Sequence, residues 1–142
     1  MILLLIHAAS TLFMTGLIWF VQIVHYPLMA RVGREGFAGY EQLHSSYTTL
    51  VVGPPMLAEM ATALLLIGSP PQRIPATAVW FGAGLLALIW ASTWLLQVPQ
   101  HGILSSGFDA DAHRRLVQTN WIRTALWSVR AILVLWMLKS SS

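Results

Sequence analysis

The chain has 142 residues, of which 56% are hydrophobic and only 9% charged. A soluble domain carries about 25% charged residues, so this composition excludes an ordinary soluble protein and is typical of a membrane protein. The net charge of +3 is scattered along the chain and gives no basic patch for a nucleic-acid partner. The absence of cysteine excludes disulfides and thiolate chemistry.

The first predicted element, residues 2–25, is an apolar run long enough to cross a bilayer, since a spanning helix needs roughly 20 apolar residues. It lacks the basic start of a cleaved signal peptide, so we expect it to be retained. The second span is predicted over residues 48–67, after a helical lead-in from Glu35 to Tyr47. The Gly53-Pro54-Pro55 sequence should bend this helix, because proline lacks a backbone N–H donor.

The third and fourth spans are predicted over residues 76–98 and 119–138. Asp109 is a candidate N-cap, so we expect the fourth helix to begin near Ala110, before the membrane. Residues 1–142 are therefore predicted to form one domain, an all-α four-helix bundle. The bilayer is its first partner, and we expect it in the cytoplasmic membrane of a bacterium.

The orientation is predicted from the charges between the spans. The two longer connections carry four arginines, and the opposite side carries two basic residues. The positive-inside rule then places the long connections in the cytoplasm and both termini outside. The residues counted are Arg31, Arg34, Arg114 and Arg115 against Arg73 and Lys139.

Every span carries polar and aromatic residues on one helical face, at spacings of three, four, seven and eleven residues. Lipid tails offer no hydrogen bonds to polar groups, so these faces should meet inside the bundle. They comprise Thr15, Trp19, Gln22 and Tyr26, with His25 beside them; Tyr40, His44, Thr48, Pro55, Glu59 and Thr62; Trp90, Thr93, Trp94, Gln97 and His101; and His113, Asn120, Arg123, Thr124, Trp127 and Arg130.

A polar chamber is predicted near one membrane face. The first and third spans end on the side where the second and fourth begin, so their polar residues gather there: Gln22, His25, His44, Gln97, His101, Asn120 and Arg123. Deeper, Glu59 follows Thr48 by eleven residues and Arg130 follows Asn120 by ten. At about 1.5 Å per residue both lie roughly 15 Å deep, where an unpaired charge is costly. We therefore predict a structural Glu59–Arg130 ion pair.

The chamber is interpreted as a site for a flat, apolar molecule with polar groups. In this hypothesis His25 acts as a general base, while Arg123, with Asn120 beside it, stabilises a developing oxyanion. The ligand-binding residues would be Gln22, His44, Trp94, Gln97, His101 and Trp127. Alternatively His25, His44 and His101 hold a divalent metal, or two of them a haem. In the plainer interpretation His25 and His101 are ordinary residues of the membrane interface. His44 would then be a helix-surface histidine bonded to Tyr40 or Tyr47. The sequence leaves open whether any cofactor is present.

Three short motifs carry a resemblance. "HYPLM" at residues 25–29, "VPQH" at 98–101 and "NWIRTALWSVR" at 120–130 resemble the small four-span membrane proteins of the anthrone-oxygenase-like family. The best-matching positions are His25, Asn120, Trp121 and Arg123, and family members often have "VPLN" where this chain has "VPQH". The resemblance implies a four-span fold and an oxidoreductase acting on an aromatic or quinone-like molecule, as in the oxidation of anthrones to anthraquinones, without a dedicated cofactor.

A second class of function is a non-catalytic subunit of a larger membrane complex, or a homo-oligomer. Such a protein should present small residues for helix contact with its partner. The candidate segments are Gly82–Ala87 and His7–Thr11.

Overall fold

The computed structural model describes residues 1–141 and shows an all-α protein without a strand in that range. Four helical spans, Ile2–Met29, Arg34–Gly68, Ala76–Leu104 and Ala110–Ser141, are long and apolar enough to cross a membrane. The predicted all-α four-helix fold is therefore confirmed, and the architecture fits an integral membrane protein. The helices are longer than the predicted apolar segments, because each continues into the polar residues at one end of the bundle.

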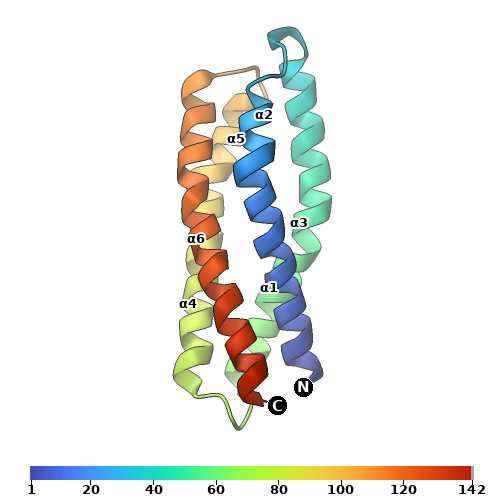
Figure 1. The fold of residues 1–142 in the computed structure, drawn as a ribbon. Coiled ribbons are helices and arrows are strands. Elements are labelled where there is room, and N and C mark those ends of the chain that lie inside the picture. Colours follow the sequence, from blue (N-terminus) through green and yellow to red (C-terminus); the bar gives the residue numbers. More distant parts are fainter. Residues whose placement is uncertain (142) are drawn as a thin grey trace.

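The spans consist of several helical elements (Figure 1). Short π-helical turns, which are wider than α-helical turns, interrupt the first and third spans. The elements in chain order are α1 (Ile2–Phe20), the π-helical η1 (Val21–His25), α2 (Tyr26–Met29), the 3₁₀-helical η2 (Arg34–Gly36), α3 (Phe37–Gly68), α4 (Ala76–Ser92), the π-helical η3 (Thr93–Gln97), α5 (Val98–Leu104) and α6 (Ala110–Ser141).

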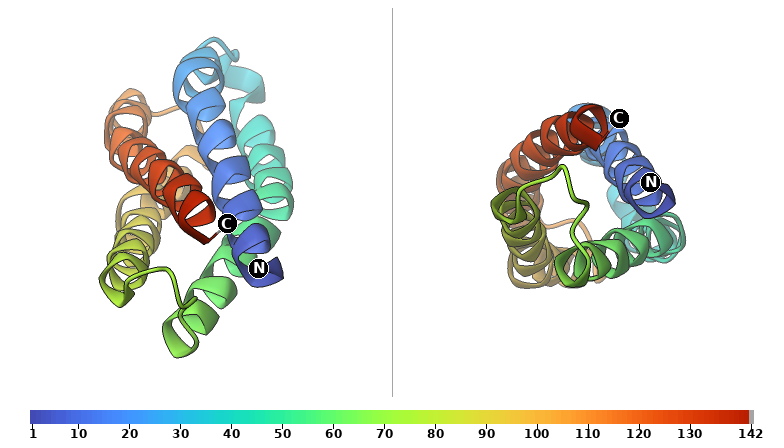
Figure 2. Two further views of the ribbon diagram at one scale, coloured as in Figure 1. Left: turned by 60° about the horizontal axis from the view of Figure 1, so that its bottom comes forward. Right: turned by 90° about the horizontal axis from the view of Figure 1, so that it is seen from below.

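The helices form a ring in which neighbours along the chain are neighbours in space, and α6 closes the ring against α1 (Figure 2). The directions alternate, so both termini lie at one end and both long connections at the other (Figure 1). As a consequence α3 and α6 face each other across the bundle axis. The sequence-based placement of the two long connections at one end agrees with this arrangement, while their sidedness in the membrane stays a prediction.

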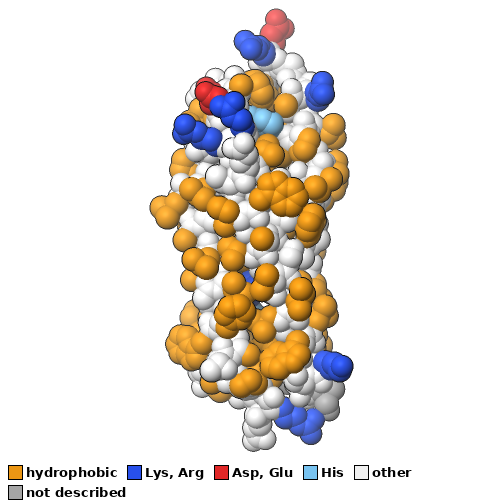
Figure 3. All heavy atoms as spheres, turned by 60° about the vertical axis from the view of Figure 1, so that its left-hand side comes forward, with side chains coloured by type: hydrophobic (Ala, Val, Ile, Leu, Met, Phe, Trp, Pro, Cys, Tyr) orange, Lys and Arg blue, Asp and Glu red, His pale blue; other side chains and the backbone are white. Residues whose placement is uncertain are grey.

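The surface has the distribution expected of a lipid-embedded bundle. Hydrophobic side chains cover the middle of the face drawn in Figure 3, and charged side chains gather at its two ends. Large apolar residues such as Leu95 and Ile132 are more than 70% exposed. In water such a surface would associate, whereas in a bilayer it faces lipid tails.

Prolines explain the irregular turns. Pro27 follows η1 and Pro99 follows η3, each two residues beyond the turn. A proline gives no hydrogen bond to the carbonyl four residues earlier and its ring presses against that carbonyl, so the preceding turn widens. Pro54 and Pro55 lie inside α3, which continues without interruption but changes direction in its middle (Figure 2, left).

The N-cap of α6 is formed as its sequence indicates. The Asp109 carboxylate accepts a hydrogen bond of 2.7 Å from the backbone N–H of Ala112. This bond satisfies one of the N–H groups that have no partner in the first turn of a helix. The helix begins at Ala110, as predicted.

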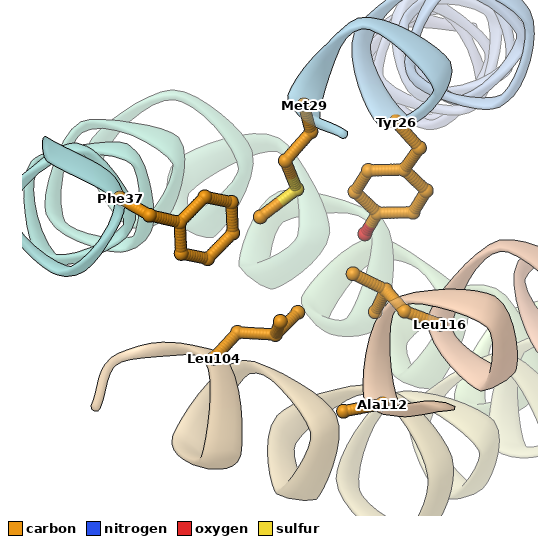
Figure 4. Close-up of a cluster of buried hydrophobic side chains, with 6 residues drawn as sticks. All are labelled: Tyr26, Met29, Phe37, Leu104, Ala112 and Leu116. Carbon is orange, nitrogen blue, oxygen red and sulfur yellow. The ribbon is translucent and has the colours of Figure 1, made fainter. Parts of the chain in front are cut away.

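Three apolar clusters fill the bundle along its axis. The cluster near the long connections joins α2, α3, α5 and α6 (Figure 4), and consists of Tyr26, Met29, Phe37, Leu104, Ala112 and Leu116. The middle cluster contains Met14, Ile18, Met56, Ile89 and Trp127, and the third contains Leu4, Leu66, Ile74, Val79 and Met137. Polar layers lie between these clusters, and they are the candidate sites.

Candidate functional site

The deeper polar layer centres on the predicted pair of Glu59 and Arg130. The guanidinium lies across the bundle from α3, with 2.8 Å from its Nη2 to Glu59 Oε1 and 2.9 Å from its Nε to the same oxygen. Neither side chain is more than 1% exposed. Glu59 also accepts hydrogen bonds from the Thr11 hydroxyl at 2.6 Å and from the Trp127 indole N–H at 3.1 Å.

The remaining groups of this layer complete the arginine's contacts. Arg130 Nη1 donates to the backbone carbonyl of Gly82, where a larger residue would crowd Leu133. Its Nη2 lies 3.3 Å from His7 Nε2, and His7 Nδ1 lies 2.7 Å from the Thr62 hydroxyl. His7, which appears isolated in the sequence, is thus part of the layer. Every charged or imidazole group here has a partner, which indicates a structural role.

The shallower polar layer borders a cavity of about 370 Å³. Its inner wall is apolar and includes Met14, Ile18 and Met56 of the middle cluster. Its rim includes Thr49 on α3 and Gly102 on α5, both exposed on the surface of membrane-spanning helices. Most of the polar groups lie towards the long connections, and they comprise Tyr26, His44, Ser45, Thr48, Thr49, Thr93, Gln97, His101, Ser105 and Arg123.

A hydrogen-bond chain leads from this cavity to a buried carboxylate. The Tyr26 hydroxyl lies 3.2 Å from His101 Nε2, and His101 Nδ1 lies 2.6 Å from Glu41 Oε1. Tyr26 and His101 both line the cavity, whereas Glu41 is 0% exposed. The chain connects α2, α5 and α3. An imidazole held by a carboxylate on one nitrogen is suited to exchanging protons through the other.

His44 lies beside this chain. Its ring centre is 5.5 Å from that of His101, and its Nδ1 is 3.1 Å from the Thr48 hydroxyl. Glu41, His44 and His101 each offer one ligand atom, and these atoms all lie within 4.8 Å of one another. These three residues can therefore hold a metal ion. The predicted set was His25, His44 and His101; the structure brings the last two together with Glu41.

Arg123 lines the cavity as a cation without a carboxylate among its described partners. Its guanidinium carbon lies 5.4 Å from the centre of the Trp127 ring, a cation–π contact. Its Nε is buried and has no hydrogen-bond partner. The Oε1 of Gln97, which also lines the cavity, is likewise buried without a partner. The Gln97 amide nitrogen donates to Thr119 at 2.9 Å. Arg123 and Gln97 thus retain polar atoms that a ligand can use.

Three predicted site residues are engaged elsewhere. The Asn120 amide donates to Gln22 at 2.8 Å, and Gln22 donates to the backbone carbonyl of Val117 at 3.2 Å. Both amides are buried, and neither lines the cavity. Trp127 is buried as well and donates to Glu59. These hydrogen bonds hold neighbouring helices together, although Asn120 Oδ1 itself has no partner. The role of the three residues in ligand binding stays a prediction.

Trp94 and His25 also depart from the prediction. Trp94 is 60% exposed and faces outward, because the wide η3 turn directs Thr93 and Gln97 to the cavity and leaves Trp94 outside. The His25 ring stacks on that of His44 at 4.3 Å and lies 3.5 Å from the Tyr40 hydroxyl, but it does not line the cavity. His101 therefore occupies the place that the sequence assigned to His25.

Glu41 is the site residue that the sequence analysis missed. It precedes the predicted second span and was treated as part of a polar lead-in. One signal could have found it: Glu41 and His44 form a Glu-x-x-His pair, whose members share a helical face. Such pairs supply metal ligands inside helix bundles.

The segments proposed for contact with a partner protein face inward in part. Gly82 approaches Leu133 and Arg130 on α6, and Ala8 is buried in the bundle. The small residues at these positions therefore serve packing within this chain. Ala9, Gly84 and Ala87 in the same segments are exposed, so contact with a partner through them stays a prediction.

Comparison with known protein families, curated proteins and solved structures gives no match to this chain. Its function must therefore be argued from the site.

Proposed function

We propose that this membrane protein binds a small, flat, largely apolar molecule taken from the bilayer and removes a proton from it. The proton transfer would prepare the molecule for oxidation, with the electrons passing to an external acceptor such as dioxygen. The molecule would be an aromatic or quinone-like compound with one or two oxygen atoms. The observation that carries the proposal is an apolar cavity whose polar end joins the Tyr26–His101–Glu41 hydrogen-bond chain.

The dimensions and position of the cavity support this ligand class. About 370 Å³ falls in the range of roughly 300–1,000 Å³ that is usual for small-molecule sites. The walls are mainly apolar, with a few polar groups placed at one end, which is the composition that orients a ligand by its oxygens. The exposed rim between α3 and α5 would give access from the edge of the lipid phase.

The polar groups supply acid–base chemistry. His101, oriented by Glu41 at 2.6 Å, can take up a proton directly or through the Tyr26 hydroxyl. The charge left on the ligand oxygen would be stabilised by Arg123, since a guanidinium in a partly dry site acts strongly on a developing oxyanion. The resulting anion is electron-rich and more readily oxidised than the neutral molecule. The motif resemblance to the anthrone-oxygenase-like proteins points to the same ligand class.

The test uses anthrone and detergent-purified protein. We expect wild-type protein to bind anthrone and shift its absorption towards that of the anion, at a pH where anthrone in empty micelles stays neutral. Val52 lines the cavity, so Val52→Trp should abolish binding. His101→Gln should keep binding but lose the anion signal.

The matched control is Val51→Trp, because Val51 is 49% exposed and does not line the cavity. This variant should bind anthrone as the wild type does. Equal binding by the Val51 and Val52 variants, or wild-type protein that leaves the anthrone spectrum unchanged, would contradict the proposal.

A further inference from the structure

We infer that Glu41, His44 and His101 form a site for one first-row divalent transition-metal ion at the polar end of the cavity. Two imidazoles and one carboxylate, with further coordination positions left open, are a donor set that binds zinc and non-haem iron. The inference goes beyond the proposed function and does not depend on it. Because the ion would occupy Glu41 and His101 Nδ1, the metal-bound and the proton-accepting states of His101 are alternatives.

The positions of the three residues suit a shared ion. Glu41 and His44 lie one turn apart on the same face of α3, and His101 reaches them from α5. Their ligand atoms lie within 4.8 Å of one another, the closest pair being Glu41 Oε1 and His101 Nδ1 at 2.6 Å. Ligands about 2.0–2.2 Å from a metal stand about 3–4 Å apart. Side-chain rotations that change these separations by about 1 Å are therefore sufficient.

The outer partners of a metal site are already in place. Metal-binding histidines usually donate their second ring N–H to an oxygen, which fixes the ring and its tautomer. The Thr48 hydroxyl lies 3.1 Å from His44 Nδ1, and the Tyr26 hydroxyl lies 3.2 Å from His101 Nε2. His44 Nε2 is then left to bind the ion, and His101 Nδ1 would exchange its 2.6 Å contact with Glu41 Oε1 for a bond to the ion. The Glu41 carboxylate is held by the Ser45 hydroxyl at 3.0 Å.

A buried oxygen without a partner is the second, independent observation. Glu41 is 0% exposed, and its Oε2 has no hydrogen-bond donor among the described residues. Leaving a buried carboxylate oxygen unsatisfied is costly, more so for a charged group than for a neutral one. In Glu59, by contrast, donors satisfy both oxygens. A cation bound between Glu41 and the two imidazoles would compensate for the missing donor.

The experiment is a Co²⁺ titration of chelator-treated, detergent-purified full-length protein, followed by visible absorption. We expect one Co²⁺ per chain, displaced by Zn²⁺. Glu41→Gln, His44→Gln and His101→Gln should each weaken binding by at least the roughly 10- to 100-fold seen when an outer partner is lost. Thr48→Val, which removes such a partner from His44, should weaken it within that range.

Two matched controls separate this site from alternatives. Glu35→Gln neutralises an exposed glutamate in η2, directly before α3, and should leave Co²⁺ binding unchanged. His25→Gln should retain the one-ion stoichiometry, because His25 stacks on His44 without belonging to the cluster. If His25→Gln abolished binding while Glu41→Gln kept wild-type affinity, the three-histidine site would replace the one inferred here.

X-ray absorption of the cobalt-loaded wild-type protein keeps the inference testable even if a variant does not fold. We expect the spectrum to indicate two imidazoles together with oxygen ligands. Three imidazoles, or no stoichiometric Co²⁺ or Zn²⁺ uptake by the wild type, would overturn the inference. Either result would leave the anthrone test unaffected, because that test is scored by ligand binding and by the Val52 variant.

Discussion

Replacing Glu59 with alanine is expected to destabilise the bundle strongly. The substitution removes the acceptor of hydrogen bonds from Thr11, Trp127 and Arg130 and leaves a guanidinium that is 1% exposed without its counter-ion. Breaking a buried ion pair by removing one partner costs about 3–5 kcal/mol. Summing the separate bonds would overstate the effect, because they share one charge and are not additive.

Thermal unfolding in detergent, followed by circular dichroism, measures this cost. A change of 1 kcal/mol shifts Tm by about 2–4 °C in chains slightly longer than this one, so Glu59→Ala should lower Tm by about 10–15 °C. Glu35→Ala is the matched control, because it removes an exposed carboxylate from the same chain and should shift Tm by no more than about 2 °C. Equal Tm values for the two variants would refute the ion-pair reasoning.

A double variant tests whether the two charges are coupled. Glu59→Met with Arg130→Met removes both charges at similar volume and should be less destabilised than either single substitution. A charge exchange should not restore stability. In the exchanged protein the indole N–H of Trp127 would face a guanidinium, and the Gly82 carbonyl would face a carboxylate.

Two further predictions concern the ends of the bundle. Asp109→Ala should destabilise the protein by about 1 kcal/mol through loss of the α6 N-cap, measured by thermal unfolding, whereas Asp111→Ala, in an exposed pair, should leave Tm nearly unchanged. Single cysteines at Arg34 and Asp109 should react with an impermeant reagent from the same side of the membrane, predicted to be cytoplasmic, and a cysteine at Gln72 from the other. Labelling of positions 34 and 109 from opposite sides would contradict the topology.

The sequence predicts a feature well when any other arrangement of the same residues would cost much free energy. Apolar runs must span the membrane because water excludes them, and this gives the four helices. Glu59 and Arg130 lie at similar depth in segments that cannot leave either charge unpaired, and the structure brings them together. An aspartate immediately before a helix commonly caps it, and Asp109 forms the N-cap of α6.

The details of the cavity depend on smaller energies. A π turn rotates the residues of a span relative to one another, and an α-helical spacing carried through η3 places Trp94 inside when it lies outside. The hydrogen bond between Gln22 and Asn120 could not be predicted from the sequence either, because each amide can pair with groups in several directions. Glu41 illustrates a third limit. Its position before the apolar run suggests a solvated carboxylate, yet the extended α3 buries it against α5.

The two polar layers are connected through the wall of the cavity. Met56 lines the cavity one turn before Glu59, and Arg123 covers the Trp127 ring whose indole donates to Glu59. The fully paired layer therefore fixes the positions of the groups above it. In the shallower layer Arg123, Glu41 and Gln97 retain polar atoms without partners, although each such atom is buried. Folding alone would favour satisfying such atoms within the chain. Arg123 Nε and Gln97 Oε1, which line the cavity, therefore support the proposed ligand, and Glu41 Oε2 supports the inferred ion.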